Sequence, residues 1–243
     1  MKRQFILKRL IFQGVLQVIM LSSFCTSWAQ KPDSLFNTSY TVTTESRYIW
    51  RGIDCGGPST NISADIGWRG IHMEFFAGVN LQQTDYQELD LSLYYEWHDI
   101  YLGFTDYWCS ADNPSWFRFR MPTTGHTIEA FAGYDFGPLY VSWCTHVAGQ
   151  DINSADRRQW SSYLELTSAD LEWANLCWQA SLGIVPWQTE YYDVDGLSVN
   201  NVSLRIAKEI VRTDHMSLPV FMQLTANPAD EKLYCIVGMT LNL

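Results

Sequence analysis

Three residues near the start of the chain have the types and the spacing to form a charged site. Glu45, Arg47 and Arg51 follow one another at even intervals, so in an extended strand their side chains share one face. The two arginines either form a basic patch that attracts anions, or pair with carboxylates and hold their strand in register. We favour the second interpretation, in which Gly52 permits the chain to turn out of the strand.

Cysteine offers no obvious site. The five cysteines after the N-terminal segment are Cys55, Cys109, Cys144, Cys177 and Cys235. Their spacing fits no zinc motif, so we predict no metal and no cofactor. A disulfide from Cys109 to Cys144, or from Cys55 to Cys109, is an alternative to small apolar side chains that fill space.

Catalytic residues are equally hard to find. A lipid-hydrolysing barrel would need a serine and a histidine together on its lipid face, near the outer edge. His146 has a suitable height but the inward parity, and the chain has no Gly-x-Ser-x-Gly motif. We therefore predict that the protein is not an enzyme.

The composition narrows the fold class. The chain has 243 residues, of which 17% are charged and 15% aromatic, whereas a soluble domain has about 25% charged residues. So many aromatic residues exclude disorder, and a net charge of −10 argues against nucleic-acid binding. Beyond the N-terminus no apolar run approaches the ~18 residues of a membrane-spanning helix.

The N-terminal segment has the pattern of a secretory signal peptide. Four basic residues precede the apolar run 10–24, and small residues lie at Ser27 and Ala29. We predict a signal peptide over 1–29, cleaved before Gln30, and a single domain over 30–243. Cleavage would remove four basic and no acidic residues and would change the net charge to −14.

The remainder of the chain alternates between apolar and polar residues with a period of two, which is typical of strands with one apolar face. The clearest case is 89–97, where every second residue is apolar. Twelve such segments are expected, at 39–51, 60–69, 71–82, 87–98, 100–110, 126–136, 138–148, 160–169, 174–185, 198–210, 217–226 and 232–243. Most have about the 9–11 residues that a tilted strand needs to cross a bilayer.

The connections between these segments alternate between short and long. Short links such as Arg69-Gly70 and His98-Asp99 follow the even-numbered segments, and longer polar links follow most odd-numbered ones. Outer-membrane barrels have this pattern of tight periplasmic turns and long external loops. We predict an all-β fold, a transmembrane antiparallel up-and-down β-barrel of about 12 strands.

Aromatic residues are expected at both membrane interfaces of this barrel. Those beside the short turns are Trp68, Trp97, Phe136 and Trp173, and those beside the long loops are Trp50, Trp108, Trp160 and Trp187. The main alternative is a secreted β-sandwich with these aromatic side chains in its core. Their concentration at strand ends favours the barrel.

With the apolar parity facing lipid, the charged side chains face the lumen. The predicted lumen-lining residues are Glu45, Arg47, Arg51, Asp65, Glu74, Asp90, Glu96, Glu129, Glu165, Arg205 and Glu209. Glycines on the same parity, such as Gly103 and Gly133, leave room for large neighbours such as Tyr94. The barrel is therefore expected to be partly filled.

The segment Ser46-Arg47-Tyr48-Ile49-Trp50-Arg51-Gly52-Ile53 resembles the TorF family of porins. Members carry an early Ser-x-Tyr-x-aromatic-Arg-Gly-aliphatic pattern, a proline a few residues later, and a second strand with an acidic residue near its end. Pro58 and Asp65 match that arrangement. The resemblance implies a pore in the outer membrane of a Gram-negative bacterium and specifies no solute. The chain departs from many outer-membrane proteins in ending on Leu243 instead of Phe or Trp.

These features together predict a passive channel for small hydrophilic solutes, with a narrow lumen of net acidic character. The expected partners are the lipid bilayer, the solutes and, during biogenesis, the outer-membrane assembly machinery. The alternative is a plugged barrel that acts as an adhesin, an envelope scaffold or a partner of another complex, with loops 111–125, 149–159 and 186–197 making the contacts.

Overall fold

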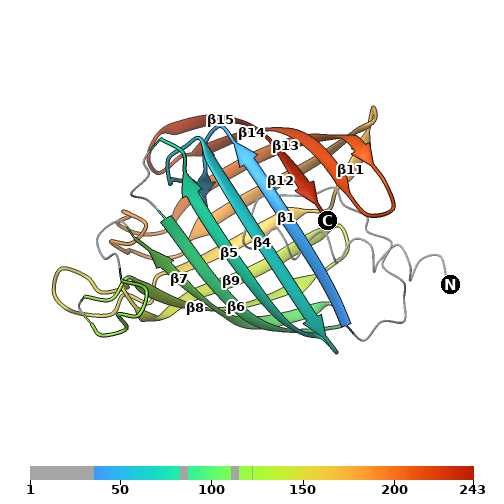
Figure 1. Cartoon of the computed structure of the whole chain (residues 1–243). Coiled ribbons are helices and arrows are strands. Elements are labelled where there is room, and N and C mark those ends of the chain that lie inside the picture. The colour runs from blue at the N-terminus through green and yellow to red at the C-terminus, as the bar shows by residue number, and fades with distance from the viewer. Residues whose placement is uncertain (1–35, 83–86, 111–114, 122) are drawn as a thin grey trace.

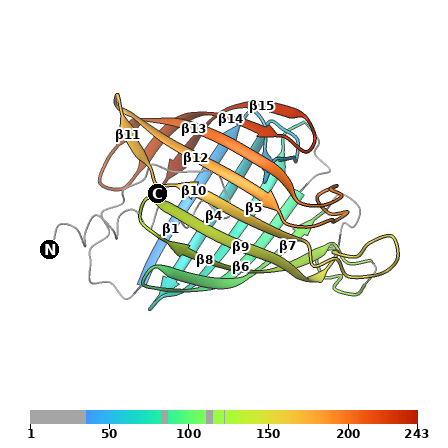
Figure 2. The same cartoon turned by 180° about the vertical axis from the view of Figure 1, so that it is seen from behind.

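The computed structural model describes residues 36–82, 87–110, 115–121 and 123–243. Its wall is one antiparallel sheet that closes on itself, as Figures 1 and 2 show from opposite sides. The strands are β1 Phe36–Glu45, β4 Ser59–Trp68, β5 Ile71–Asn80, β6 Gln87–Trp97, β7 Ile100–Cys109, β8 His126–Asp135, β9 Leu139–Gly149, β10 Ser162–Ser168, β11 Leu171–Trp173, β12 Leu176–Val185, β13 Ser198–Arg212, β14 Ser217–Asn227 and β15 Lys232–Asn242. The predicted signal peptide lies outside the described residues, among which no helix is long and apolar enough to cross a membrane.

Two pairings close the ring. Strand β1 pairs with β15, and β10 pairs with β12. Strands β10 and β11 both pair with β12, so together they occupy one strand position in the wall. The barrel therefore has twelve strand positions. The predicted all-β fold and its strand number are confirmed.

Two boundaries differ from the prediction in a way that changes the fold. The first strand ends at Glu45 instead of residue 51, and the next residues form a separate small hairpin, β2 Ile49–Trp50 and β3 Ile53–Asp54. The expected turn at 170–173 is occupied by β11, and the chain reverses at Ala174-Asn175, where both residues have positive φ. Two consecutive positive φ values give the type I′ turn, whose twist matches that of the flanking strands, so the hairpin continues for another three residues.

The outer face of the barrel matches a membrane. Apolar side chains such as Leu93, Leu102 and Phe104 are exposed on it. Trp68, Trp97, Phe136 and Trp173 are exposed beside the short turns, and Trp160 and Trp187 beside the long loops. An apolar band between two aromatic ends on a closed barrel is the arrangement of bacterial outer-membrane proteins, and the chain has this location, as predicted.

Two of the predicted interface aromatics lie elsewhere. Trp50 belongs to the β2–β3 hairpin and packs inside the barrel against Tyr107 and Tyr192. Trp108 is 4% exposed, and a Cβ at Gly125 would lie 2.9 Å from its Nε1 atom. Gly125 therefore packs on the indole of Trp108, and this side chain is buried instead of facing lipid.

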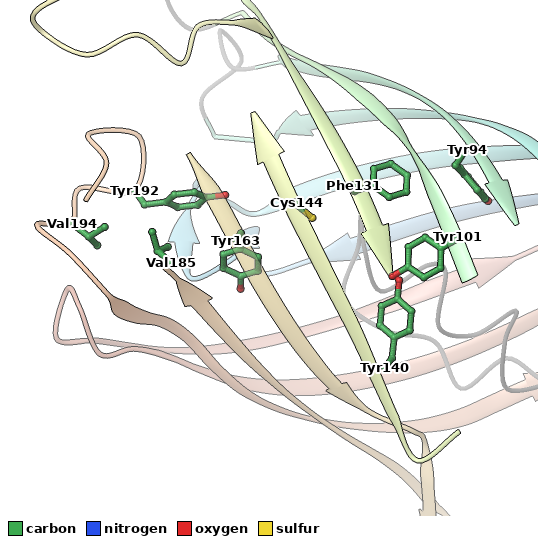
Figure 3. Packing of buried hydrophobic residues seen from close by; sticks show 9 residues of the cluster. All are labelled: Tyr94, Tyr101, Phe131, Tyr140, Cys144, Tyr163, Val185, Tyr192 and Val194. Carbon is green, nitrogen blue, oxygen red and sulfur yellow. The ribbon is translucent and has the colours of Figure 1, made fainter. Parts of the chain in front are cut away.

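The inner face is filled by aromatic rings (Figure 3). The buried cluster consists of Tyr94, Tyr101, Phe131, Tyr140, Cys144, Tyr163, Val185, Tyr192 and Val194. Glycines make room for it, since a Cβ at Gly103 would lie 2.5 Å from the Cβ of Tyr94, and one at Gly183 1.7 Å from the Tyr163 hydroxyl. Large rings can thus lie flat against the wall beside a glycine, which pins strand register.

Candidate functional site

The loop between β1 and β4, residues 46–58, turns into the barrel. Its β2–β3 hairpin, Ile49–Asp54, is here named the plug hairpin. At its tip Arg51 has φ 50° and Gly52 φ 81°, again the pattern of a type I′ turn. A non-glycine residue at positive φ is uncommon, and here the side chain of that residue makes the strongest contact of the loop.

Arg51 forms a buried ion pair with β8. Its Nη1 and Nη2 atoms donate to Glu129 Oε2 at 2.6 Å and Oε1 at 2.8 Å, and Nη1 also donates to the Tyr192 hydroxyl at 2.9 Å. The side chains of Arg51 and Glu129 are 4% and 1% exposed. Bidentate guanidinium–carboxylate pairs are among the strong, directional hydrogen-bonded pairs in proteins, so this contact fixes the tip of the hairpin.

The opposite side of the same tip contacts another part of the wall. Asn227 Nδ2, at the end of β14, donates to the Gly52 carbonyl oxygen at 3.2 Å. The Gly52 α-carbon also lies so close to β13 that a Cβ there would be 1.8 Å from the Asn200 carbonyl oxygen. Around the ring β8 is five strands from β1 in one direction, and β14 and β13 are two and three strands away in the other. The plug hairpin therefore bridges the interior from one wall to the far wall.

Glu129 is held by further groups. The Tyr107 hydroxyl donates to its Oε1 atom at 3.0 Å, and His146 Nε2 lies 3.4 Å from Oε2. On its other side His146 Nδ1 lies 3.8 Å from Asp151 in the loop after β9. His146 thus faces inward, as its parity predicts, and connects the ion pair to an external loop.

Asp151 anchors that loop. Ser161 donates to it twice, from the hydroxyl to Oδ1 at 2.5 Å and from the backbone N–H to Oδ2 at 3.1 Å. Burial alone would raise the pKa of Asp151, but the nearby His146 ring and the two bonds from Ser161 lower it below its ordinary value. The carboxylate therefore stays charged at neutral pH and holds both ends of the loop together.

The predicted lumen-lining residues take different positions. Glu45, Arg51, Glu74, Asp90, Glu129 and Arg205 are buried, and Asp65, Glu96, Glu165 and Glu209 are half-buried. Arg47 is exposed and pairs with Asp54 within its own loop. The prediction that Arg47 and Arg51 continue the face of Glu45 is wrong, because β1 ends before them.

Local partners hold most of these charges. Asn61 donates to Glu45 at 2.9 Å, and the Tyr94 hydroxyl to Asp65 at 2.8 Å. The guanidinium of Arg205 lies 3.4 Å from the centroid of the Phe221 ring. Glu209 pairs with Arg212 at the short-turn end of β13. Among the described residues, the ion pair of Arg51 with Glu129 joins two of the predicted residues with two hydrogen bonds.

Sequence reasoning missed several residues of this site. Tyr191 and Tyr192 come from the loop 186–197 and pack on Trp50, with ring centroids 6.3 Å away in both cases. Asn200, near the start of β13, and Asn227, at the end of β14, contact Gly52. The available signal was a Tyr-Tyr pair between charged residues of an external loop. Neither of the two candidate disulfides of Cys109 forms, and within the described residues no group of His, Cys, Asp or Glu is arranged to hold a metal ion.

No protein-family model matches the chain, and no curated protein matches it. Among solved structures it is similar to the NanC porin, with 9% identity, a TM-score of 0.47, and coverage of 84% of this chain and 98% of that one. It is also similar to the COG4313 outer membrane channel from Pseudomonas putida F1, with 11% identity, a TM-score of 0.37, and coverage of 88% and 98%. A third is Salmonella typhi OmpF in complex with daunomycin, with 8% identity, a TM-score of 0.38, and coverage of 86% and 97%.

Proposed function

We propose that the protein is a porin-like channel for small hydrophilic solutes, that its lumen prefers cations, and that the plug hairpin narrows it. The observation that carries this proposal is the charge balance of the interior. Among the described residues two arginines are buried, Arg51 and Arg205, against seven buried acidic residues, which are Glu45, Glu74, Glu88, Asp90, Glu129, Asp135 and Asp151. Fixed charge along a pore sets which ions enter it, so this excess favours cations.

Bilayer recordings of the refolded protein test this proposal. Under a salt gradient, the reversal potential should have the sign of a cation-selective pore. A clear anion preference would refute the acidic lumen. A matched Asp90→Asn variant, which removes one buried carboxylate distant from the plug hairpin in sequence, should reduce the cation preference.

A plugged barrel is the second candidate, and the plug hairpin itself favours it. A loop that contacts both walls, above an interior packed with aromatic rings, suits a scaffold or adhesin as well as a channel. The discriminating measurement is conductance after the hairpin is dislodged. If neither the wild type nor a Gly52→Ala variant conducts ions, the scaffold is favoured. Binding of its partner should then depend on loops 111–125, 149–159 and 186–197.

Membership of the TorF family is part of the same proposal. Its support is that the residues of the motif act together, since Tyr48 packs on Phe76, Trp50 on Tyr192, and Arg51 pairs with Glu129. Glu129→Gln, Trp50→Ala and Tyr48→Ala should therefore disturb the same hairpin. Non-catalytic function, cleavage after Ala29 and delivery by the assembly machinery remain proposals, and N-terminal sequencing of the membrane form tests the cleavage site.

A further inference from the structure

The tip of the plug hairpin occupies a site with the features of a guanidinium receptor. The carboxylate of Glu129 meets the edge of the Arg51 guanidinium with two hydrogen bonds, and the Tyr192 hydroxyl accepts a third. The rings of Trp50 and Tyr163 lie against the same group, with centroids 4.5 and 4.7 Å from Cζ. A carboxylate at the edge and aromatic rings at the face suit a planar guanidinium better than an ammonium group.

Most of this receptor belongs to the wall and its loops, not to the plug hairpin. Glu129 lies on β8, Tyr163 on β10 and Tyr192 in the loop after β12, and Trp50 is the one member on the hairpin. Glu129 keeps its bond from Tyr107 without Arg51. Withdrawal of the hairpin would therefore leave a buried, preorganised carboxylate without its cation, a state that is strongly unfavourable and is relieved by a replacement cation.

We propose that this wall site binds solutes that carry a guanidinium group, and that such solutes displace Arg51 and release the plug hairpin. The proposal rests on the channel function argued above. The Arg51 side chain then occupies the site in the absence of solute. The guanidinium of the solute replaces that of Arg51 when the solute binds. Neutral and anionic solutes lack the charge that Glu129 requires, and ammonium solutes lack the planar fork.

The loop that carries Arg51 sets the solute concentration that is needed to displace it. A group held on a short loop competes at a millimolar effective concentration, so a free solute has to reach about that concentration to displace Arg51. Removal of the Arg51 side chain should therefore strengthen binding of a free guanidinium by roughly tenfold or more.

The experiment measures binding of ethylguanidinium by calorimetry to the refolded full chain in detergent. The Arg51→Ala variant should bind ethylguanidinium at least about tenfold more tightly than the wild type does, and about tenfold more tightly than it binds ethylammonium or the neutral N-ethylurea. The double variant Arg51→Ala with Glu129→Gln should bind none of the three. Equal binding of guanidinium and ammonium, or no binding to Arg51→Ala, would overturn the proposal.

A variant that does not fold still gives an answer. Refolding of Arg51→Ala, followed by the heat-modifiable migration of the barrel, should then recover with ethylguanidinium in the buffer and not with ethylammonium. No recovery with either would overturn the site.

Bilayer recordings test the release step. In the wild type, millimolar ethylguanidinium should increase the open fraction and ethylammonium should not. Binding without any conductance in any variant would refute the channel and leave the receptor standing. Conductance without guanidinium binding would refute the receptor and leave the channel standing. Binding together with conductance that ethylguanidinium does not increase would overturn the release step.

Discussion

A methyl group at Gly52 should dislodge the plug hairpin. A Cβ there would lie 1.8 Å from the Asn200 carbonyl oxygen, whereas Cβ contacts under 3.0 Å essentially never occur. That oxygen is part of the wall strand β13 and has little freedom to move. The tip in Gly52→Ala must therefore withdraw by more than about 1 Å, which breaks its bond with Asn227 and draws Arg51 away from Glu129.

The cost of seating the altered hairpin has three parts. The left-handed backbone at φ +81° costs ~1 kcal/mol for alanine, and the lost neutral hydrogen bond ~1 kcal/mol. The loosened ion pair adds about 1.5–3 kcal/mol. Together they disfavour the seated state by about 4 kcal/mol, which corresponds to a shift of several hundredfold in the ratio of released to seated hairpin.

Single-channel recording in planar bilayers measures this shift as an increase in open fraction. The matched control is Gly137→Ala, in the short turn between β8 and β9, where φ is +91° and a Cβ meets nothing within 4 Å. It has the same backbone penalty without the collision, so it should behave as the wild type does. Equal behaviour of Gly52→Ala and Gly137→Ala would refute the reasoning, provided that both migrate as intact barrels.

Three further predictions concern other contacts of the interior. Glu129→Gln should increase the ratio of released to seated hairpin by about two to four orders of magnitude, because breaking a buried ion pair costs ~3–5 kcal/mol. Glu74→Gln, which changes a buried carboxyl group on β5, should not, and equal increases would contradict the plug. Gly183→Ala should lower the free energy of unfolding by about 1–3 kcal/mol in urea titrations, because its Cβ would lie 1.7 Å from a buried tyrosine hydroxyl. Gly196→Ala, where a Cβ meets nothing within 4 Å, is the control, and an equal effect there would contradict this packing. Asp151 has a lowered pKa, so its contribution to stability is present above pH ~4 and is lost as the pH falls through its folded pKa. Unfolding titrations should therefore show a smaller loss of stability on acidification in Asp151→Asn than in the wild type. Parallel curves of the free energy of unfolding against pH would contradict that role.

The wall of the barrel is predictable from sequence because its signals are local. Alternation along a strand places Leu93 outward and Tyr94 inward whatever the other strands do. Likewise Arg69-Gly70 signals a tight turn by itself, since both residues adopt positive φ. Parity likewise predicts that the side chains of Glu129 and His146 face inward, and both are buried.

The plug hairpin was not predictable in the same way, because period-two alternation continues through it. Arg47 and Arg51 keep the parity of Glu45, and Ile49–Trp50 and Ile53–Asp54 do form short strands. What separates them from β1 is the turn at Arg51, a residue that seldom has positive φ. Its conformation depends on Glu129, which is 78 residues away in the chain. Such a distant pairing leaves no trace in local periodicity.

The division between wall and plug also explains why one can move without the other. Apart from the short β11, every wall strand pairs with two neighbours, so opening the wall means breaking ladders of backbone hydrogen bonds. The plug hairpin pairs two residues with two others, and an isolated two-stranded hairpin of any length is marginal in water. Its position therefore depends on a few side-chain contacts, chiefly those of Arg51 and Gly52, and not on the barrel's own stability. An element held in this way is the part of the molecule that a competing cation can displace while the wall stays intact.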